Sequence, residues 1–238
     1  MWDHLWASQP TPPYALVWAT ALAALAVVAY RPAWRVARNA ITIAHEGGHA
    51  LVAVLCGRRL QAITLHSDTS GLTVTKGRPH GPGMVFTLMV GYIAPSLIGL
   101  AAAFALGEHR IRLTLWIAIV LLVAMLFMTR NLYGILAIVI TGGIVFAISW
   151  YTSAQVQAVF AYLAVWFLLI GGVRPIFELA GQRHQGRARD SDPDQLARLT
   201  HVPGGLWLTL FGIVCVGALL LGISLLNLLH GQLHLHLT

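Results

Sequence analysis

Residues 131–173 read NLYGILAIVITGGIVFAISWYTSAQVQAVFAYLAVWFLLIGGV and contain no Asp, Glu, Lys or Arg. A helix needs about 20 apolar residues to cross the hydrocarbon core of a bilayer. This stretch is therefore long enough for two membrane spans, with the expected break at Tyr151-Thr152-Ser153. Four other stretches are equally free of charged residues, namely 4–30, 79–107, 113–129 and 199–238.

The composition of the whole chain agrees with membrane spans. Of its 238 residues, 58% are hydrophobic and 10% are charged, and the mean hydropathy is +0.75. A soluble domain usually carries about 25% charged residues, and a disordered chain is polar, so both classes are excluded. The net charge of +7 comes from Arg residues at the ends of apolar runs, which is a topology signal in membrane proteins. We therefore expect a lipid bilayer around the chain and no nucleic-acid partner.

These features predict an all-α polytopic membrane protein with about six or seven transmembrane helices in a single domain, residues 1–238. The hydrophilic stretch 174–203 is too short for a separate soluble domain, which typically needs at least about 50 residues. The expected spans lie near 14–30, 39–57, 84–106, 112–129, 131–149, 154–173 and 205–229.

The Lys and Arg residues at the ends of these spans predict the orientation, because positively charged loops stay in the cytosol. Of the 15 Lys and Arg residues, most lie on the side of the N-terminus. The residues on the other side are Arg31, Arg35, Arg38, Arg110 and Arg112. The excess places the N-terminus in the cytosol and the C-terminus outside, although the Arg residues at 31–38 argue against this orientation.

The segment after the second expected span has a strand pattern. In residues 60–75, LQAITLHSDTSGLTVT, β-branched residues alternate with polar ones on both sides of 67–71, SDTSG. Such alternation around a Gly-containing loop predicts a short β-hairpin. The alternative is an ordinary loop between two helices.

The second expected span contains the residues with the clearest chemistry, because residues 44–50 read AHEGGHA. His45 and His49 lie one turn apart on one face of a helix, so both imidazoles can bind one tetrahedral metal ion. Glu46 directly follows the first histidine, where its carboxylate can act as the general base toward a water molecule on the metal. The two glycines allow another backbone or a substrate to approach closely.

Glu46 is also the only Asp or Glu within the seven expected spans. A carboxylate inside a membrane is energetically costly and indicates a functional site. A buried Glu–His pair that joins two helices would explain Glu46 and one histidine. It would leave the second histidine, four residues away, without a role, so the pattern favours a metal site.

A histidine motif of the form AHEGGHAL in a membrane helix, followed by a hairpin-like segment, resembles the site-2-type intramembrane zinc metalloproteases. The chain is more closely similar to the compact bacterial M50B-like branch of the M50 peptidase family, over roughly residues 30–230. The matching features are HEGGHALVAVLCGRRL at 45–60, HSDTSGLTV at 66–74, RNLYG at 130–134, and Ser191-Asp192 followed by QLARLT and PGGLW. The resemblance implies Zn²⁺ bound by His45 and His49, Glu46 as the catalytic base, and a multi-pass protein in the plasma membrane of a bacterium.

The third zinc ligand departs from the wider family, whose members supply an Asp from an Asp-Gly pair in a later helix. In this chain Asn131 opens a helix, but no acidic residue follows it until Glu178. Asp192 matches the Ser-Asp position of the branch and is the implied ligand. It also reads as a helix N-cap, because Asp-Pro-Asp-Gln is a capping pattern. The remaining candidate ligands are Asp190, Asp194 and His201.

The resemblance implies a zinc-dependent endopeptidase that hydrolyses a peptide bond of a membrane-embedded protein near the cytosolic face. We expect the hairpin to dip toward the site and to bind unwound substrate through its main chain, so Gly71 and Thr73 are candidate substrate-binding residues. Asn131 is a third candidate, for substrate backbone or a developing oxyanion, or else it is a helix N-cap. The alternatives are a metal-binding or metal-transporting membrane protein and a catalytically silent relative that keeps the fold.

Overall fold

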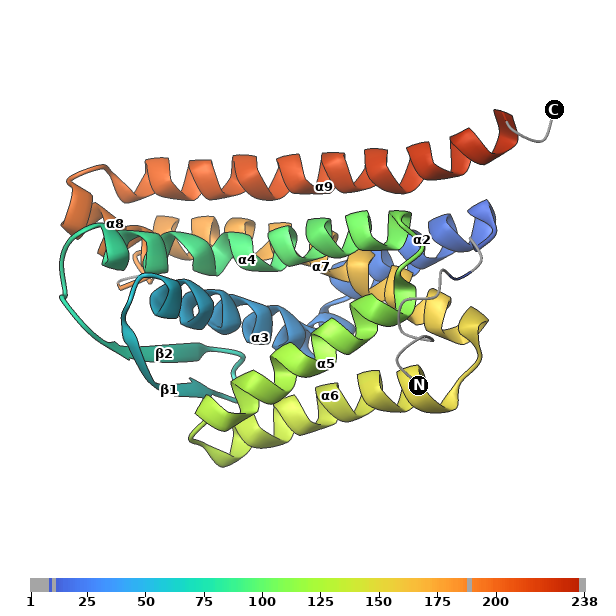
Figure 1. Ribbon diagram of the computed structural model, residues 1–238. Coiled ribbons are helices and arrows are strands. Elements are labelled where there is room, and N and C mark those ends of the chain that lie inside the picture. Colours follow the sequence, from blue (N-terminus) through green and yellow to red (C-terminus); the bar gives the residue numbers. More distant parts are fainter. Residues whose placement is uncertain (1–8, 10–11, 188–189, 236–238) are drawn as a thin grey trace.

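The computed structural model describes residues 9, 12–187 and 190–235, with side chains up to Leu226. Figure 1 shows a bundle of helices with one small sheet at its edge. The elements are α2 (Tyr14–Ala29), α3 (Arg31–Leu55), β1 (Arg59–Leu65), β2 (Gly71–Lys76), α4 (Pro82–Gly107), α5 (Ile111–Met128), α6 (Leu132–Tyr151), α7 (Ala154–His184), α8 (Asp192–Thr200) and α9 (Gly204–Leu235).

The long helices α4, α7 and α9 pack side by side, and α3 packs along α4 (Figure 1). The largest core cluster joins α2, α4, α5, α6, α7 and α9, with buried residues such as Val17, Leu106, Ile111 and Trp166. We call the end of the bundle that carries β1, β2 and α8 the hairpin end. The opposite end, which carries the turn between α4 and α5 and the start of α7, is the far end.

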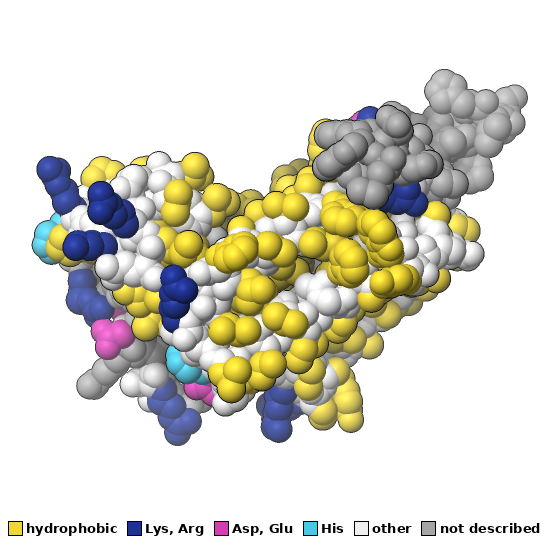
Figure 2. Space-filling view, turned by 60° about the horizontal axis from the view of Figure 1, so that its bottom comes forward, with side chains coloured by type: hydrophobic (Ala, Val, Ile, Leu, Met, Phe, Trp, Pro, Cys, Tyr) yellow, Lys and Arg dark blue, Asp and Glu magenta, His cyan; other side chains and the backbone are white. Residues whose placement is uncertain are grey.

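Helices α4, α5, α6, α7 and α9 are each long and apolar enough to cross a membrane. Helices α2 and α3 meet at a bend of 103°, and only the two together are long and apolar enough to cross a membrane. The described chain therefore has up to six candidate spans. Figure 2 shows hydrophobic side chains over the middle of the molecule and Lys and Arg mostly near the hairpin end. The chain is therefore an all-α multi-pass membrane protein. The segment 39–57 forms no separate span, because it continues a helix whose first turns carry Arg31, Arg35 and Arg38.

The bend between α2 and α3 changes the side on which the chain begins. The Gln9 backbone N–H donates to the His109 carbonyl at 3.1 Å, and the Gln9 side-chain amide donates to Gln157 Oε1 at 3.1 Å. Both partners lie at the far end. The prediction that the N-terminal segment lies at the same end as the hairpin is therefore wrong, because α2 and α3 form one bent pair in place of two separate spans.

Because of the same bend, the Arg residues at 31–38 do not lie at the far end, on the side opposite the hairpin, as the sequence predicted. Arg174 on α7 donates to the Val28 carbonyl in the last turn of α2, and Arg38 forms an ion pair with Glu178 at 3.4 Å. These partners lie in the part of α7 that leads to the hairpin end. Of the described Lys and Arg residues, only Arg110 and Arg112 lie at the far end, so the charge asymmetry between the two ends is stronger than the sequence count indicated.

The hairpin is confirmed. Strands β1 and β2 pair antiparallel, with Leu65 opposite Gly71 beside the turn. In the turn, the hydroxyl and the backbone N–H of Ser70 donate to Asp68 Oδ1 and hold the pKa of that carboxyl below its usual value. The segment 129–131 between α5 and α6 covers the other edge of β1. Strand β2 is therefore the outer strand of the sheet, and it lies beside α3.

Candidate metal centre

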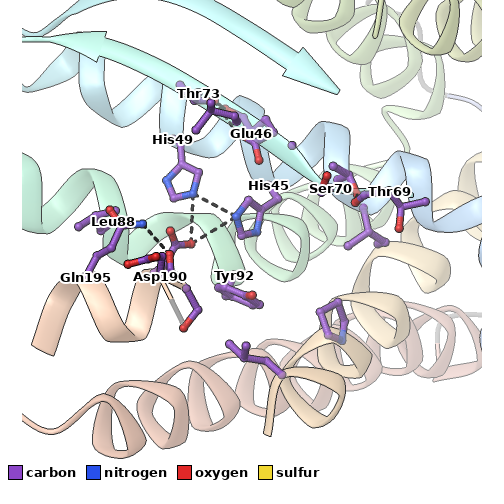
Figure 3. A pocket seen from close by; sticks show the side chains of 18 of the residues that line it. His45, Glu46, His49, Thr69, Ser70, Thr73, Leu88, Tyr92, Asp190 and Gln195 are labelled. Atoms are coloured by element: carbon purple, nitrogen blue, oxygen red, sulfur yellow. Dashed lines mark hydrogen bonds and ion pairs between the residues drawn. The ribbon is translucent and has the colours of Figure 1, made fainter. Parts of the chain in front are cut away.

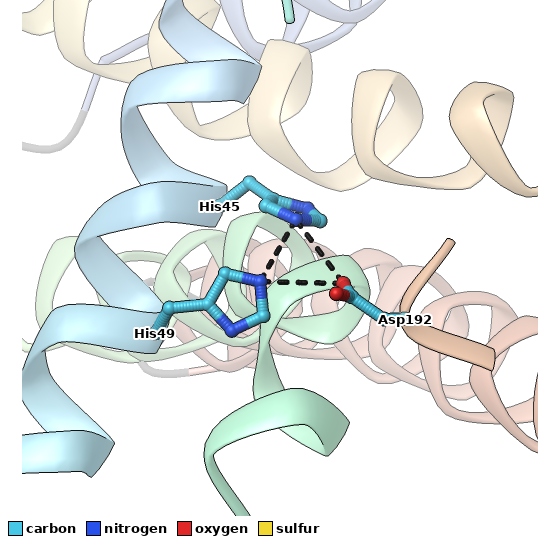
Figure 4. A group of neighbouring side chains, drawn as sticks. All are labelled: His45, His49 and Asp192. Atoms are coloured by element: carbon cyan, nitrogen blue, oxygen red, sulfur yellow. Dashed lines mark hydrogen bonds and ion pairs between the residues drawn. The ribbon is translucent and has the colours of Figure 1, made fainter. Parts of the chain in front are cut away.

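Two elements far apart in the sequence bring three ligand-type side chains together (Figure 4). His45 and His49 lie one turn apart on α3, and Asp192 is the first residue of α8. The Nε2 atoms of the two histidines are 3.0 Å apart. Asp192 Oδ2 lies 3.3 Å from His45 Nε2 and 3.2 Å from His49 Nε2. The three atoms therefore form a nearly equilateral triangle.

This triangle fits a bound metal ion. In a tetrahedral site with bonds of about 2.0–2.1 Å, the ligand atoms are about 3.3 Å apart. Asp192 Oδ2 is buried, and within the described residues no hydrogen-bond donor from outside the triangle reaches it. A buried carboxylate oxygen without such a partner is costly unless a cation neutralises it. Burial alone would raise the pKa of the Asp192 carboxyl, but His49 and His45 hold it below its usual value when their imidazoles are protonated, a role that a bound cation would take over.

The start of α8 explains why Asp192 can face the histidines. Ser191, not Asp192, is the N-cap residue, and its hydroxyl donates to Asp194 Oδ2 at 2.7 Å. The capping prediction for Asp192 is therefore wrong by one position. Because Asp192 sits inside the first turn, its carboxylate is free of the cap and points toward α3 (Figure 4).

The other candidate ligands have different partners. Asp194 pairs with Arg183 on α7, which holds α8 against the bundle. Asp190 pairs with Arg198 at 3.0 Å on the surface. His201 is the exposed C-cap residue of α8, in the left-handed conformation with φ 60°. Of the four candidates, Asp192 is the one that the fold brings to the histidine pair.

Helix α4 holds the two imidazoles in place. The ring nitrogen Nδ1 of His49 lies 2.6 Å from the Thr87 carbonyl. The Nδ1–H donates in this contact, which leaves the lone pair of Nε2 directed at the triangle. The ring of His45 packs edge-on against Tyr92, with ring centroids 4.8 Å apart. These contacts fix the orientation of both imidazoles, whose Nε2 atoms lie in the triangle with Asp192.

Glycines allow α3 and α4 to approach this closely. A Cβ at Gly91 would lie 2.3 Å from His49 Nε2 and 2.7 Å from His45 Nε2, so a side chain there would occupy the metal centre. A Cβ at Gly48 would lie 2.4 Å from the Cβ of Ala94. Gly48 therefore permits the close helix contact that the sequence predicts. Gly47 has only an ordinary contact, 3.8 Å from Met125 Sδ.

Strand β2 lies directly over Glu46 (Figure 3). The Thr73 hydroxyl is 2.6 Å from Glu46 Oε2 and 3.2 Å from the Glu46 carbonyl. A Cβ at Gly71 would lie 2.5 Å from Glu46 Oε1, so a side chain there would displace this carboxylate. The hairpin therefore reaches the site, where Gly71 and Thr73 contact the buried Glu46.

Asn131 has a different contact from the one expected. Its side-chain amide donates to the Leu65 carbonyl at 2.6 Å, and its Oδ1 accepts from the Leu65 N–H at 3.1 Å. These bonds use both polar groups of the side chain and anchor the end of β1. Asn131 occupies the N-cap position of α6, but its side chain makes no capping bond within the described structure. Asn131 therefore supports the hairpin that covers Glu46. It is not among the residues that line the cavity.

Several residues of the site are not apparent from the sequence. They line, or lie against, a cavity of about 380 Å³ formed by α3, β2, α4, α7 and the start of α8. These residues are Arg38, Thr87, Gly91, Tyr92 and Glu178. A weak signal exists for Gly91, because small residues at 91 and 94 mark a face of α4 that can approach another helix. The other residues have no such signal.

A sequence model of one family matches most of the chain. The family is described as Peptidase M50B-like, and the match covers residues 18–222. It includes the triad, Glu46, the hairpin and Asn131. No curated protein and no solved structure matches the chain.

Proposed function

The chain belongs to the Peptidase M50B-like family, and from this premise we propose that it is a zinc-dependent intramembrane endopeptidase. The observation that supports the proposal most directly is the meeting of His45, His49 and Asp192 beside the buried Glu46. Two imidazoles and one carboxylate are a known ligand set of catalytic zinc. The proposed substrate is a membrane-embedded protein, because the site lies among the candidate membrane spans.

Zinc bound by the three residues would polarise the scissile carbonyl and lower the pKa of a water molecule toward about 7. Glu46 Oε1, the oxygen that Thr73 does not contact, takes a proton from the attacking water and passes it to the amine leaving group. The Thr73 hydroxyl holds Oε2 and fixes the orientation of the carboxylate. The hydrogen bond from His49 Nδ1 to the Thr87 carbonyl keeps the metal-facing nitrogen free of a proton.

The outer strand β2 is the proposed binding edge for substrate. A transmembrane helix hides its carbonyls in i to i−4 hydrogen bonds, so it must unwind locally before hydrolysis. Each backbone group freed in hydrocarbon costs several kcal/mol unless it finds a partner. The main chain of Gly71 and Thr73 could supply those partners by strand addition. The Thr73 side chain already contacts Glu46, so its proposed role toward substrate rests on its backbone.

We further propose that the hairpin end faces the cytosol of a bacterial cell. Of the described Lys and Arg residues, only Arg110 and Arg112 lie at the far end, and most of the others lie near the hairpin end; positively charged segments stay in the cytosol. The catalytic site would then act near the cytosolic face. The start of α2 and the end of α9 would both lie on the outer side.

The proposal is tested by zinc content and cleavage in purified wild-type protein, Glu46→Gln and Asp192→Ala. We expect one zinc per chain in the wild type and in Glu46→Gln, loss of zinc in Asp192→Ala, and cleavage of membrane-protein substrates by the wild type alone. Asp190→Ala is the matched control, because Asp190 lies two residues before Asp192, pairs with Arg198 on the surface and should keep zinc when removed. A wild-type protein without zinc, or full cleavage by Glu46→Gln, would overturn the proposal. A zinc-replete wild type that cuts no membrane protein would favour the silent relative.

A further inference from the structure

The cavity contains a basic side chain besides its acidic ones, two turns before His45 on α3. Arg38 is the one Lys or Arg among the described residues that line it. Its side chain is 32% exposed, and its Nη1 lies 3.4 Å from Glu178 Oε2. A charge-assisted hydrogen bond is shorter, about 2.7–2.9 Å. Because a guanidinium has five N–H donors, most of the donors of Arg38 remain available toward the cavity.

Glu178 is held mainly by other residues. Its Oε1 accepts from Trp34 Nε1 and from Arg174 Nε, each at 2.9 Å. Arg174 also lies over the Trp34 ring, 4.7 Å from its centroid, and donates to the Val28 carbonyl. These contacts join α2, α3 and α7 without Arg38. Two guanidinium groups share one carboxylate, so this end of the cavity carries a net positive charge.

The other acidic groups of the cavity have partners of their own and do not pair with Arg38. Asp192 belongs to the metal centre, Glu46 contacts Thr73, and Asp190 pairs with Arg198. The turn of the hairpin lies over the same end as Arg38, because Thr42, one turn after it, donates to the Thr69 carbonyl at 2.9 Å. Figure 3 shows Thr69 and Ser70 on the side of His45 away from His49. A peptide that follows β2 past the histidines toward this turn reaches Arg38.

We infer that Arg38 binds a carboxylate of the substrate, an inference that rests on the proposed peptidase function. Arg38 and His45 are seven residues apart, which is about 10.5 Å along a helix. An extended peptide advances about 3.3 Å per residue, so the carboxylate lies about three residues from the hydrolysed bond. An Asp or Glu side chain and a free C-terminus both offer this group.

The experiment measures binding by the inactive variant Glu46→Gln, so that its result does not depend on hydrolysis. The probes are fluorescent membrane-spanning peptides in detergent micelles, with one helix-breaking Gly-Asn pair and Asp placed at successive positions beside it. Matched peptides carry Asn or Lys at the same positions. Two further peptides end three residues after the pair, one with a free carboxylate and one with an amide.

We expect the Asp peptide to bind about tenfold more tightly than the Asn peptide at one position about three residues from the pair. Added to Glu46→Gln, Arg38→Gln should remove this preference, Arg38→Glu should reverse it toward Lys, and Arg38→Lys should keep part of it. Arg35→Gln is the matched control, since Arg35 lies on the exposed face of α3 and does not line the cavity. Zinc content and thermal unfolding of each variant show whether it is folded.

Two results separate the sources of the carboxylate. A preference for Asp identifies a side chain, and a preference confined to the free-carboxylate peptide identifies a chain terminus. Equal binding of the Asp and Asn peptides and of the acid and amide peptides would overturn the inference, as would an unchanged preference in folded Arg38→Gln. Cleavage by the wild type without any charge preference would overturn this inference alone, whereas absence of zinc and cleavage would overturn the proposed function.

Discussion

Replacing Gly91 by Ala tests the geometry of the metal centre without requiring a substrate. The added Cβ would lie 2.3 Å from His49 Nε2. Ordinary contacts with carbon begin near 3.5 Å, so the imidazole or helix α4 must move by about 1 Å. Metal–ligand distances in a working site vary by only about 0.2 Å. The movement that Ala requires is therefore several times larger than the metal centre tolerates.

The surroundings of His49 leave little room for compensation. Its Nδ1 contacts the Thr87 carbonyl at 2.6 Å, so turning the ring away breaks that hydrogen bond. Withdrawing α4 instead would open the close contact between Gly48 and Ala94. Disturbing residues that only support a ligand reduces metal affinity by about 10- to 100-fold. Because the Gly91→Ala substitution would displace a ligand itself, we expect at least about 100-fold weaker zinc binding, or about 2.7 kcal/mol.

The assay is competition for zinc between the purified protein and a chelator of known affinity, with zinc content measured by mass spectrometry. Gly143→Ala is the matched control in α6, since apart from the adjacent backbone and residues of its own helix no described atom lies within 4 Å of the added Cβ. It should bind zinc like the wild type and unfold at the same or a higher temperature, because Ala favours a helix over Gly by about 1 kcal/mol. A folded Gly91→Ala variant with wild-type zinc affinity would refute the assignment of this histidine pair as the metal centre.

Three further predictions concern the hairpin and the metal. Thr73→Val, which removes the hydroxyl bonded to Glu46, should lower cleavage at least about tenfold with zinc content unchanged, whereas Thr73→Ser should retain most activity; equal activity of the two variants would contradict a positioning role. Asn131→Ala removes two hydrogen bonds to Leu65 and should destabilise the hairpin by about 2 kcal/mol, seen as faster amide exchange in 60–75; unchanged exchange would count against it. Removal of zinc by a chelator should lower the melting temperature of the wild type, since a ligand present at 100 times its Kd stabilises by about 2.7 kcal/mol. Asp192→Ala should show no such shift, and an equal shift in that variant would mean that the metal binds elsewhere.

The sequence alone identified the elements whose signals are local. The charge-free runs predicted the membrane helices, because length and apolarity suffice to recognise a span. The spacing of His45 and His49 predicted their shared helix face, because four residues make about one turn. Alternation around Ser67–Gly71 predicted the hairpin for the same kind of reason, since strand periodicity is also a local property.

Tertiary structure decided everything that depends on which helix faces meet. The bend of 103° between α2 and α3 moved the start of the chain to the far end. The same packing assigned Asp192 to the histidines, directed the Asn131 amide to Leu65 and placed Gly91 against the imidazoles. Helices such as α4 and α7 are apolar around much of their circumference, so either lipid or protein can cover any face. Periodicity therefore cannot reveal their neighbours, and only the packed bundle determines which distant side chains form the site.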